Sequence, residues 1–333
     1  MEGLHKPYLL FLGDAPDQPA AKTACGVADW RPEWCVGQLR LPGCNADTGL
    51  QDVSIGDAVA KGAKTIIIGI VNPGGVLPES WIPSLTEALA AGLDIASGMH
   101  RRLEEFPDIE HAAREHGRKL FNIRHTDRRF ATGTGKKRSG RRILTVGTDA
   151  NIGKKYTALS LEREMTRRGL KADFRATGQT GILIAERGVA LDAVVADFIS
   201  GAAEWVSPEN DPDHWDLIEG QGSLFHASYA GVTLGLIHGS QPDFMVLCHE
   251  PTRKHMRSLP HAPLPSIAEC LELYVTCAKL TNPAAAMAGI SVNTRALAEG
   301  EARRYLSTLE AEHDLPAVDP IRFGVAPIVD RVV

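Results

Sequence analysis

One stretch of the chain, Arg141 to Thr157, constrains the fold more than any other part of its 333 residues. The short apolar run Ile143–Val146 predicts a buried strand, and Gly153-Lys154 opens a segment with apolar residues at helical spacing. Strand, glycine-containing loop and helix in that order predict a phosphate-binding loop, because backbone N–H groups and the helix dipole then face one anion. The residues predicted to contact the ligand are Thr148, Asp149, Ala150, Asn151, Ile152, Gly153, Lys154, Lys155, Tyr156 and Thr157.

This loop departs in two ways from the usual pattern Gly-x-x-x-x-Gly-Lys-Ser/Thr. Gly147 lies one residue further from the lysine than the pattern requires, and Lys155 replaces the Ser or Thr. That hydroxyl normally binds Mg²⁺ beside the phosphates, and a lysine cannot replace it. The sequence therefore predicts a phosphate site that works without a metal. The alternative is a glycine-rich turn that only connects a strand to a helix.

Composition is that of an ordinary globular protein and excludes several classes of partner. Hydrophobic residues make up 44% and charged residues 23% of the chain, which is enough for about two domains with their own cores. The net charge of −5 argues against general binding of nucleic acids. No apolar run reaches the length of a membrane span. Without a signal-peptide pattern or a Cys-x-x-Cys pair, we expect reduced thiols and a cytoplasmic location.

The N-terminal part alternates predicted strands with predicted helices. Apolar runs at Tyr8–Leu12, Thr65–Ile70 and Leu93–Ala96 predict strands of a parallel sheet, each followed by a helical segment. The pattern predicts a Rossmann-like α/β domain over residues 1–125. Because Gly-x-Gly-x-x-Gly is missing from the first turn, we do not expect this domain to bind a nicotinamide or flavin dinucleotide.

A basic segment separates this domain from the second. Between Arg124 and Arg142 the chain has eight Lys or Arg residues and one acid, Asp127. We interpret residues 126–142 as a linker, which is either solvated and mobile or a source of positive field around a polyanionic ligand. Residues 143–333 are predicted to form an α/β domain of the P-loop NTPase type.

Further candidate site residues follow predicted strands of this second domain. Glu219 ends an apolar run and precedes Gly220-Gln221-Gly222, the place of a carboxylate in a site at the carboxyl edge of a sheet. His226 follows closely, and for it a structural role is equally open. Arg175, Gln179 and Thr180 surround another strand end. His249, Glu250 and Arg253 follow a third, and their spacing does not match a zinc site.

Several of these motifs together resemble the D-glutamate N-acetyltransferase family. They are Val146–Lys154, Ala176–Gly181, Glu219–Ser223 and Gly231–Gly235, and the resemblance extends over nearly the whole chain. It implies transfer of an acetyl group from acetyl-CoA to the amine of D-glutamate. It also implies a partner dehydrogenase in the breakdown of D-glutamate, and we expect a homo-oligomer.

The residues can be given roles that agree with this resemblance. Lys154 and Lys155 would neutralise the phosphates of CoA without a metal. Glu219 or His226 would act as the general base. Arg175 or Arg253 would hold a carboxylate of the substrate. The predicted substrate contacts are Arg175, Gln179, Thr180, Gln221 and Arg253.

Two other functions stay open at this point. The run Gly147-Thr148-Asp149 ahead of Gly153-Lys154 resembles the loop of dethiobiotin synthetase, which implies an ATP- and Mg²⁺-dependent ligase or kinase. Thr157 would then have to bind the magnesium ion. A nucleotide sensor without catalytic activity is the third possibility.

Overall fold

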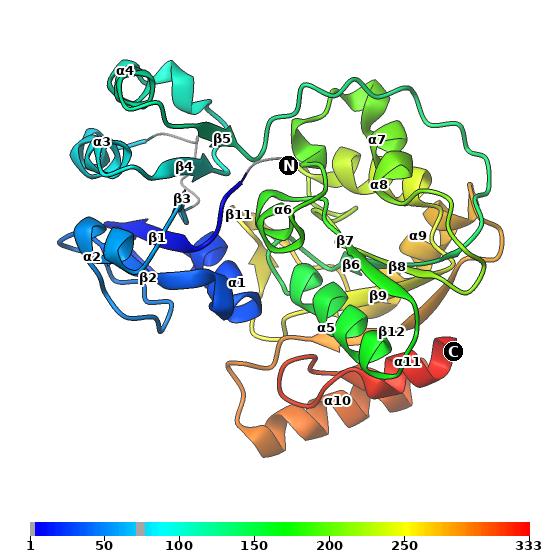
Figure 1. Ribbon diagram of the computed structural model, residues 1–333. Coiled ribbons are helices and arrows are strands. Elements are labelled where there is room, and N and C mark those ends of the chain that lie inside the picture. The colour runs from blue at the N-terminus through cyan, green and yellow to red at the C-terminus, as the bar shows by residue number, and fades with distance from the viewer. Residues whose placement is uncertain (1–3, 71–76) are drawn as a thin grey trace. The chain divides into compact units, whose positions relative to one another are not determined.

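The computed structural model describes residues 4–70 and 77–333 and divides them into two compact units (Figure 1). The first unit comprises Met1–Arg128 and Gln179–Ala193, and the second comprises Arg129–Gly178 and Val194–Val333. The sequence predicts one continuous domain over residues 143–333. In the structure, the contacts of Gln179–Ala193 place this internal segment in the first unit.

The first unit is built on a parallel sheet with the strand order β2-β1-β3-β4-β5. Its strands are β1 (Tyr8–Gly13), β2 (Cys35–Arg40), β3 (Thr65–Ile68), β4 (Asp94–Ser97) and β5 (Leu120–Asn122). Its helices are α1 (Lys22–Trp30), α2 (Ile55–Ala60), α3 (Ile82–Ala90), α4 (Pro107–Glu115) and α6 (Gln179–Ala185). β1, β3 and β4 are buried along their whole length, as expected for strands covered on both faces. This confirms the predicted Rossmann-like architecture.

The second unit holds a parallel sheet with the order β13-β12-β9-β6-β8-β7. Its strands are β6 (Arg141–Gly147), β7 (Ala172–Arg175), β8 (Trp215–Ile218), β9 (Phe244–His249), β12 (Ala286–Val292) and β13 (Ala317–Val318), and a separate antiparallel pair is β10 (His255–Met256) and β11 (Leu259–Pro263). Its helices are α5 (Lys154–Arg167), α7 (Ile199–Val206), α8 (Ala230–Ser240), α9 (Ile267–Lys279), α10 (Glu299–His313) and α11 (Ala326–Val332).

Helices cover both faces of this second sheet (Figure 1). On one face α5 and α11 pack on the strands, and their buried residues form one core with Ile143 and Leu217. On the other face α8 and α9 pack against β6 and β12. Because β6 lies between β8 and β9, its carboxyl end is surrounded by the ends of both neighbours. The loop after β6 is therefore the centre of the candidate site.

Candidate functional site

The predicted strand, loop and helix of the phosphate loop are present. β6 ends at Gly147, and α5 begins at Lys154. Gly153 precedes the helix with a φ of 114°, a conformation that glycine adopts far more readily than other residues. The first backbone N–H groups of α5 have no partner within the helix and carry the positive end of its dipole. The amino end of α5 can therefore receive an anion.

Lys154 is held inside this loop rather than in solvent. Its residue is 6% exposed, and its Nζ donates a hydrogen bond to the carbonyl oxygen of Asp149 at 2.7 Å. Burial lowers the pKa of Lys154 to about 8, and the negative charges of Asp149 and Glu219 oppose this shift. A buried ammonium group gains from an anionic partner, and the phosphate of a ligand is such a partner.

Asp149 organises the loop through its carboxylate, which is fully buried. One oxygen accepts from the backbone N–H of Ala150 at 2.6 Å. The other accepts from Nη1 of Arg253 at 2.8 Å and from the backbone N–H of Arg257 at 2.8 Å. Arg253 also donates to Glu250 at 2.7 Å. The guanidinium of Arg253 thus stabilises the phosphate loop. If Arg253 bound a substrate carboxylate as predicted, that contact would compete with these hydrogen bonds.

Glu219 follows β8 directly and binds the loop that follows β7. Its Oε2 accepts from the backbone N–H groups of Thr177 at 3.0 Å and Gly178 at 3.1 Å. Gln221 contributes to the same arrangement, because its Nε2 donates to Oγ1 of Thr177 at 3.0 Å. The negative charge of Glu219 acts on Lys154 and raises its pKa, against the effect of burial. The structure therefore brings Glu219 and Gln221, which belong to one sequence motif, together with Lys154 of the phosphate loop.

Position 220 requires glycine because the chain after β8 passes very close to β6. A Cβ atom at this position would lie 1.7 Å from the carbonyl oxygen of Thr145, and the N–H of Gly220 donates to Oγ1 of Thr145 at 2.9 Å. The chain after β8 therefore lies directly against β6. This contact holds Glu219 beside the phosphate loop.

His226 is buried, with both ring nitrogens in use. Nε2 lies 2.9 Å from the carbonyl oxygen of Arg257, which can only accept, so Nε2 carries the proton. Nδ1 accepts from the backbone N–H of Ser228 at 3.1 Å, and the ring stacks on Tyr229 at 4.4 Å between centroids. To act as the predicted base, His226 would have to release Ser228. Of the two candidate bases, Glu219 is the one beside Lys154.

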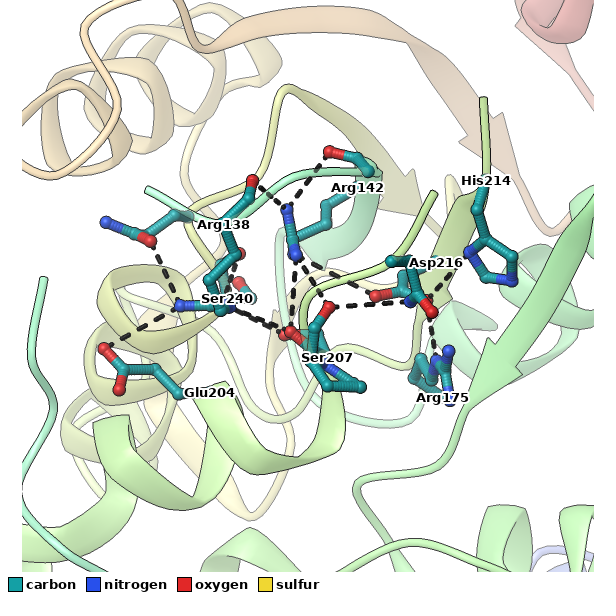
Figure 2. Close-up of polar contacts among 12 residues, drawn as sticks. Arg138, Arg142, Arg175, Glu204, Ser207, His214, Asp216 and Ser240 are labelled. Atoms are coloured by element: carbon teal, nitrogen blue, oxygen red, sulfur yellow. Dashed lines mark hydrogen bonds and ion pairs between the residues drawn. The ribbon is translucent and has the colours of Figure 1, made fainter. Parts of the chain in front are cut away.

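Arg175 is the last residue of β7, and its side chain lies in a buried polar cluster (Figure 2). Its Nε donates to Oδ1 of Asp216 at 2.7 Å, and Asp216 is the second residue of β8. Burial raises the pKa of Asp216, and the charge of Arg175 opposes this rise. The side chain of Arg175 is thus directed to the amino-terminal half of β8, away from Glu219 at the carboxyl end. Its predicted contact with the substrate would require this ion pair to open.

Two arginines of the predicted linker belong to the same cluster (Figure 2). Arg142 is 1% exposed and donates to the carbonyl oxygens of Ser139 at 3.0 Å and Pro208 at 2.8 Å. Arg138 donates to the carbonyl oxygen of Gly239 at 2.8 Å, and burial lowers its pKa to about 10. Arg138 and Arg142 are neither part of a solvated linker nor a source of positive field around a ligand, because their guanidinium groups donate to carbonyl oxygens inside the unit.

Gln179 and Thr180 belong to the first unit. Oγ1 of Thr180 lies 3.0 Å from Oγ1 of Thr23 in α1. A Cβ atom on Gly98 would lie 2.6 Å from the side chain of Gln179. The structure therefore assigns these two residues to the packing of α6 on the first unit, and their predicted contact with a substrate stays a prediction.

Two residues beside the loop carry no motif of their own. Nδ1 of His249 lies 3.2 Å from Oγ1 of Thr148, and the hydroxyl of Tyr274 donates to the carbonyl oxygen of Gly147 at 2.7 Å. The sequence indicates His249 as a candidate site residue, because it lies at the end of a predicted strand. In the sequence, Tyr274 cannot be told from the apolar residues of a helix, and no pattern indicates where its hydroxyl bonds.

Residues 4–70 and 77–333 contain neither a group of metal ligands nor a helix that could span a membrane. Within these ranges, no three or more His, Cys, Asp or Glu side chains are grouped so that they could hold a metal ion. Within the same ranges, no helix combines the length and the apolar character that crossing a membrane requires.

Comparison with known proteins identifies the family. The model of the DUF1611_C P-loop domain, a domain of unknown function, matches residues 129–329, and that of the DUF1611_N Rossmann-like domain matches residues 39–126. A D-glutamate N-acetyltransferase of Tritonibacter scottomollicae is 52% identical over 329 residues, 99% of each chain. Another, from a Pseudoalteromonas species, is 51% identical and covers 97% of each chain. The crystal structure of a DUF1611 family protein from Anabaena variabilis superposes with a TM-score of 0.89 at 32% identity, covering 98% of this chain and 99% of that one. These matches confirm the resemblance stated from the motifs. The chain belongs to the DUF1611 family, and the models of both domains of that family match it.

Proposed function

We propose that this protein is a D-glutamate N-acetyltransferase. The observation that carries the proposal is identity above 50% with two proteins of that name over nearly the full length of the chain. The name requires an acyl donor, and we propose acetyl-CoA. The cytoplasmic location, the homo-oligomer and the partner dehydrogenase remain predictions from the sequence.

The phosphate loop supports acetyl-CoA as the donor. CoA carries a pyrophosphate and a further phosphate, which suit the amino end of α5 and the buried ammonium of Lys154. Lys155 adds a second positive charge at the position where a kinase has a metal-binding hydroxyl. Acetyl transfer needs no metal at the phosphates, because no phosphoryl group is transferred. The residues of the loop therefore fit a CoA ester better than an ATP–Mg²⁺ complex.

The reaction proceeds through attack of the substrate amine on the thioester carbon. A new C–N bond forms while the carbonyl oxygen takes up negative charge. Collapse of this intermediate breaks the C–S bond, and the CoA thiolate leaves with the proton that the nitrogen loses as it becomes an amide. The substrate ammonium must first lose a proton. We assign this proton to Glu219, a buried carboxylate at the carboxyl end of β8 that accepts hydrogen bonds from the loop after β7.

The ligase or kinase alternative depends on Thr157. In the structure, Oγ1 of Thr157 lies 2.7 Å from Oγ of Ser291 in β12 and donates to the carbonyl oxygen of Gly153 at 3.1 Å. These bonds direct the hydroxyl into the body of the unit. A magnesium ion at the phosphates would have to displace them, which favours the acetyltransferase.

One assay separates the functions. The purified protein is incubated with acetyl-CoA and D-glutamate, and released CoA is followed with a thiol reagent. We expect release with D-glutamate and much less with L-glutamate. Phosphate release from ATP would favour the ligase or kinase, and ligand binding without turnover would favour the sensor. Either result, in the absence of CoA release, overturns the proposal.

A further inference from the structure

Arg257 lies at the tip of a short hairpin, and this tip contacts the phosphate loop. Arg257 and Ser258 form the turn between β10 and β11. The backbone N–H of Arg257 donates to Oδ2 of Asp149 at 2.8 Å. The carbonyl oxygen of Arg257 accepts from Nε2 of His226 at 2.9 Å. Asp149 and His226 are both buried, so two side chains of the site hold the main chain of this one residue.

The side chain of Arg257 is not engaged in the way its main chain is. Arg257 is exposed, and among the residues that the structure describes none forms a hydrogen bond or an ion pair with its guanidinium. Arg253, four residues earlier, is different, because its guanidinium donates to Asp149 at 2.8 Å and to the carbonyl oxygen of Ala150 at 2.6 Å. Arg257 therefore adds a positive charge beside the loop that the described residues leave unpaired.

The chemistry of CoA indicates which anion Arg257 can bind. In CoA a single ribose separates the pyrophosphate from the 3′-phosphate, whereas the thioester lies at the far end of the pantetheine arm. A residue fixed beside a loop that binds the pyrophosphate is therefore close to the 3′-phosphate and remote from the thioester. The planar guanidinium of an arginine can donate two parallel hydrogen bonds to one phosphate group.

We infer that Arg257 forms a subsite for the 3′-phosphate of CoA. This inference rests on the proposed function, because it takes acetyl-CoA as the donor. The hydrogen bonds from Asp149 and His226 fix the hairpin tip, so that the loop and the hairpin bind different phosphate groups of one ligand. ATP has no phosphate on its 3′-hydroxyl, so this contact favours a CoA ester over ATP. Arg257 is a specificity-determining residue and takes no part in the acetyl transfer itself.

Calorimetry with CoA and 3′-dephospho-CoA tests the subsite. For the wild type we expect CoA to bind about 10- to 100-fold more tightly, the range of a charge-assisted hydrogen bond. Arg257→Ala is expected to reduce this ratio below about threefold and to change the Kd of 3′-dephospho-CoA less than about twofold, since that ligand lacks the group that Arg257 binds. Arg304→Ala in α10 is the matched control and is expected to keep the full ratio. Arg304 is likewise exposed, and among the described residues its guanidinium has no hydrogen bond or ion pair.

Two results with the variants overturn the inference. One is a folded Arg257→Ala protein that keeps the ratio of the wild type. The other is a variant with the ratio intact and a raised KM for D-glutamate, which assigns the guanidinium to a substrate carboxylate. Arg257→Gln, which keeps much of the length of the side chain without its charge, gives the same test where Arg257→Ala does not fold.

The wild type alone separates failure of the subsite from failure of the proposed function, because calorimetry needs no turnover. Equal affinities for CoA and 3′-dephospho-CoA overturn the subsite and leave acetyl-CoA as the donor. A protein that binds neither ligand overturns acetyl-CoA as the donor, and the subsite with it. A preference for CoA that depends on Arg257 supports the subsite even where no CoA is released from acetyl-CoA and D-glutamate.

Discussion

The hydroxyl of Tyr274 in α9 donates to the carbonyl oxygen of Gly147 at 2.7 Å, at the end of β6. The same oxygen atom of Tyr274 accepts from the backbone N–H of Leu224 at 3.1 Å. Burial raises the pKa of Tyr274 to about 12, so the phenol stays protonated and can donate. One buried side chain thus connects the phosphate loop with the loop that follows Glu219.

We expect Tyr274→Phe to destabilise the protein by about 1–3 kcal/mol, because buried backbone groups lose their partner. Tyr8→Phe is a matched control in the first unit: Tyr8 is also fully buried, and its hydroxyl has no hydrogen-bond partner among the described residues. The free energies of unfolding are compared by urea denaturation. Equal effects of the two substitutions would contradict the role given to the Tyr274 hydroxyl.

Gly220→Ala is expected to disrupt the second unit. The added Cβ would lie 1.7 Å from the carbonyl oxygen of Thr145, so β6 and the chain after β8 must separate. Gly231→Ala in α8 meets no atom within 4 Å and is expected to be neutral or stabilising by up to about 1 kcal/mol, as alanine favours helices. Thermal unfolding and CoA release of both variants check this. A Gly220→Ala protein as stable as the wild type would mean that the two segments can move apart freely.

The affinity for acetyl-CoA is expected to fall as the pH rises above about 8. The pKa of Lys154 is lowered to about 8, so in the free protein the ammonium that binds phosphate is progressively lost above this value. Lys154→Ala is expected to weaken binding by about 1.5–3 kcal/mol at neutral pH and to remove most of this dependence. Calorimetry from pH 7 to 9.5 measures both effects. The same slope in the alanine variant would assign the titration to another group.

Glu219→Gln separates the chemical role of this residue from its structural one. The amide oxygen of glutamine can still accept from Thr177 and Gly178, so the loop after β7 is expected to stay in place. If Glu219 is the base, turnover falls at least about a hundredfold while the Kd of acetyl-CoA is nearly unchanged. Glu301→Gln, at an exposed position of α10, serves as the control. A variant that keeps most of its turnover would move the assignment to His226.

Catalysis is expected to survive exhaustive treatment with EDTA. Lys155 brings positive charge to the position where a kinase binds Mg²⁺, and the hydroxyl of Thr157 is bonded to Ser291. Lys155→Thr is expected to weaken acetyl-CoA binding without producing an ATPase. CoA release is measured after EDTA and again during titration with Mg²⁺. Loss of turnover that Mg²⁺ restores would support the ligase or kinase instead.

The sequence predicts well what depends on neighbours along the chain. The order of strand, loop and helix around Lys154 can be predicted from the local spacing of apolar residues and glycine. The choice of Glu219 as a candidate site residue rests on its position directly after a buried strand. Long polar side chains are harder to predict, because their partners depend on which strands lie side by side. Arg175 pairs with Asp216 only because β7 and β8 are neighbours.

The position of Gln179–Ala193 in the first unit affects the order in which the protein is synthesised and the ways in which its gene can recombine. The chain passes from the first unit to the second after Arg128, returns after Gly178 and leaves again after Ala193. A ribosome therefore releases all five strands of the first sheet long before α6, whose Thr180 is the partner of Thr23. A gene fragment that ends at Arg128 encodes the first sheet without α6. A fragment that begins after Arg128 encodes α6 without the part of the first unit on which it packs. The first unit is therefore incomplete without a stretch encoded inside the second, so recombination cannot exchange the two as separate modules at a single junction.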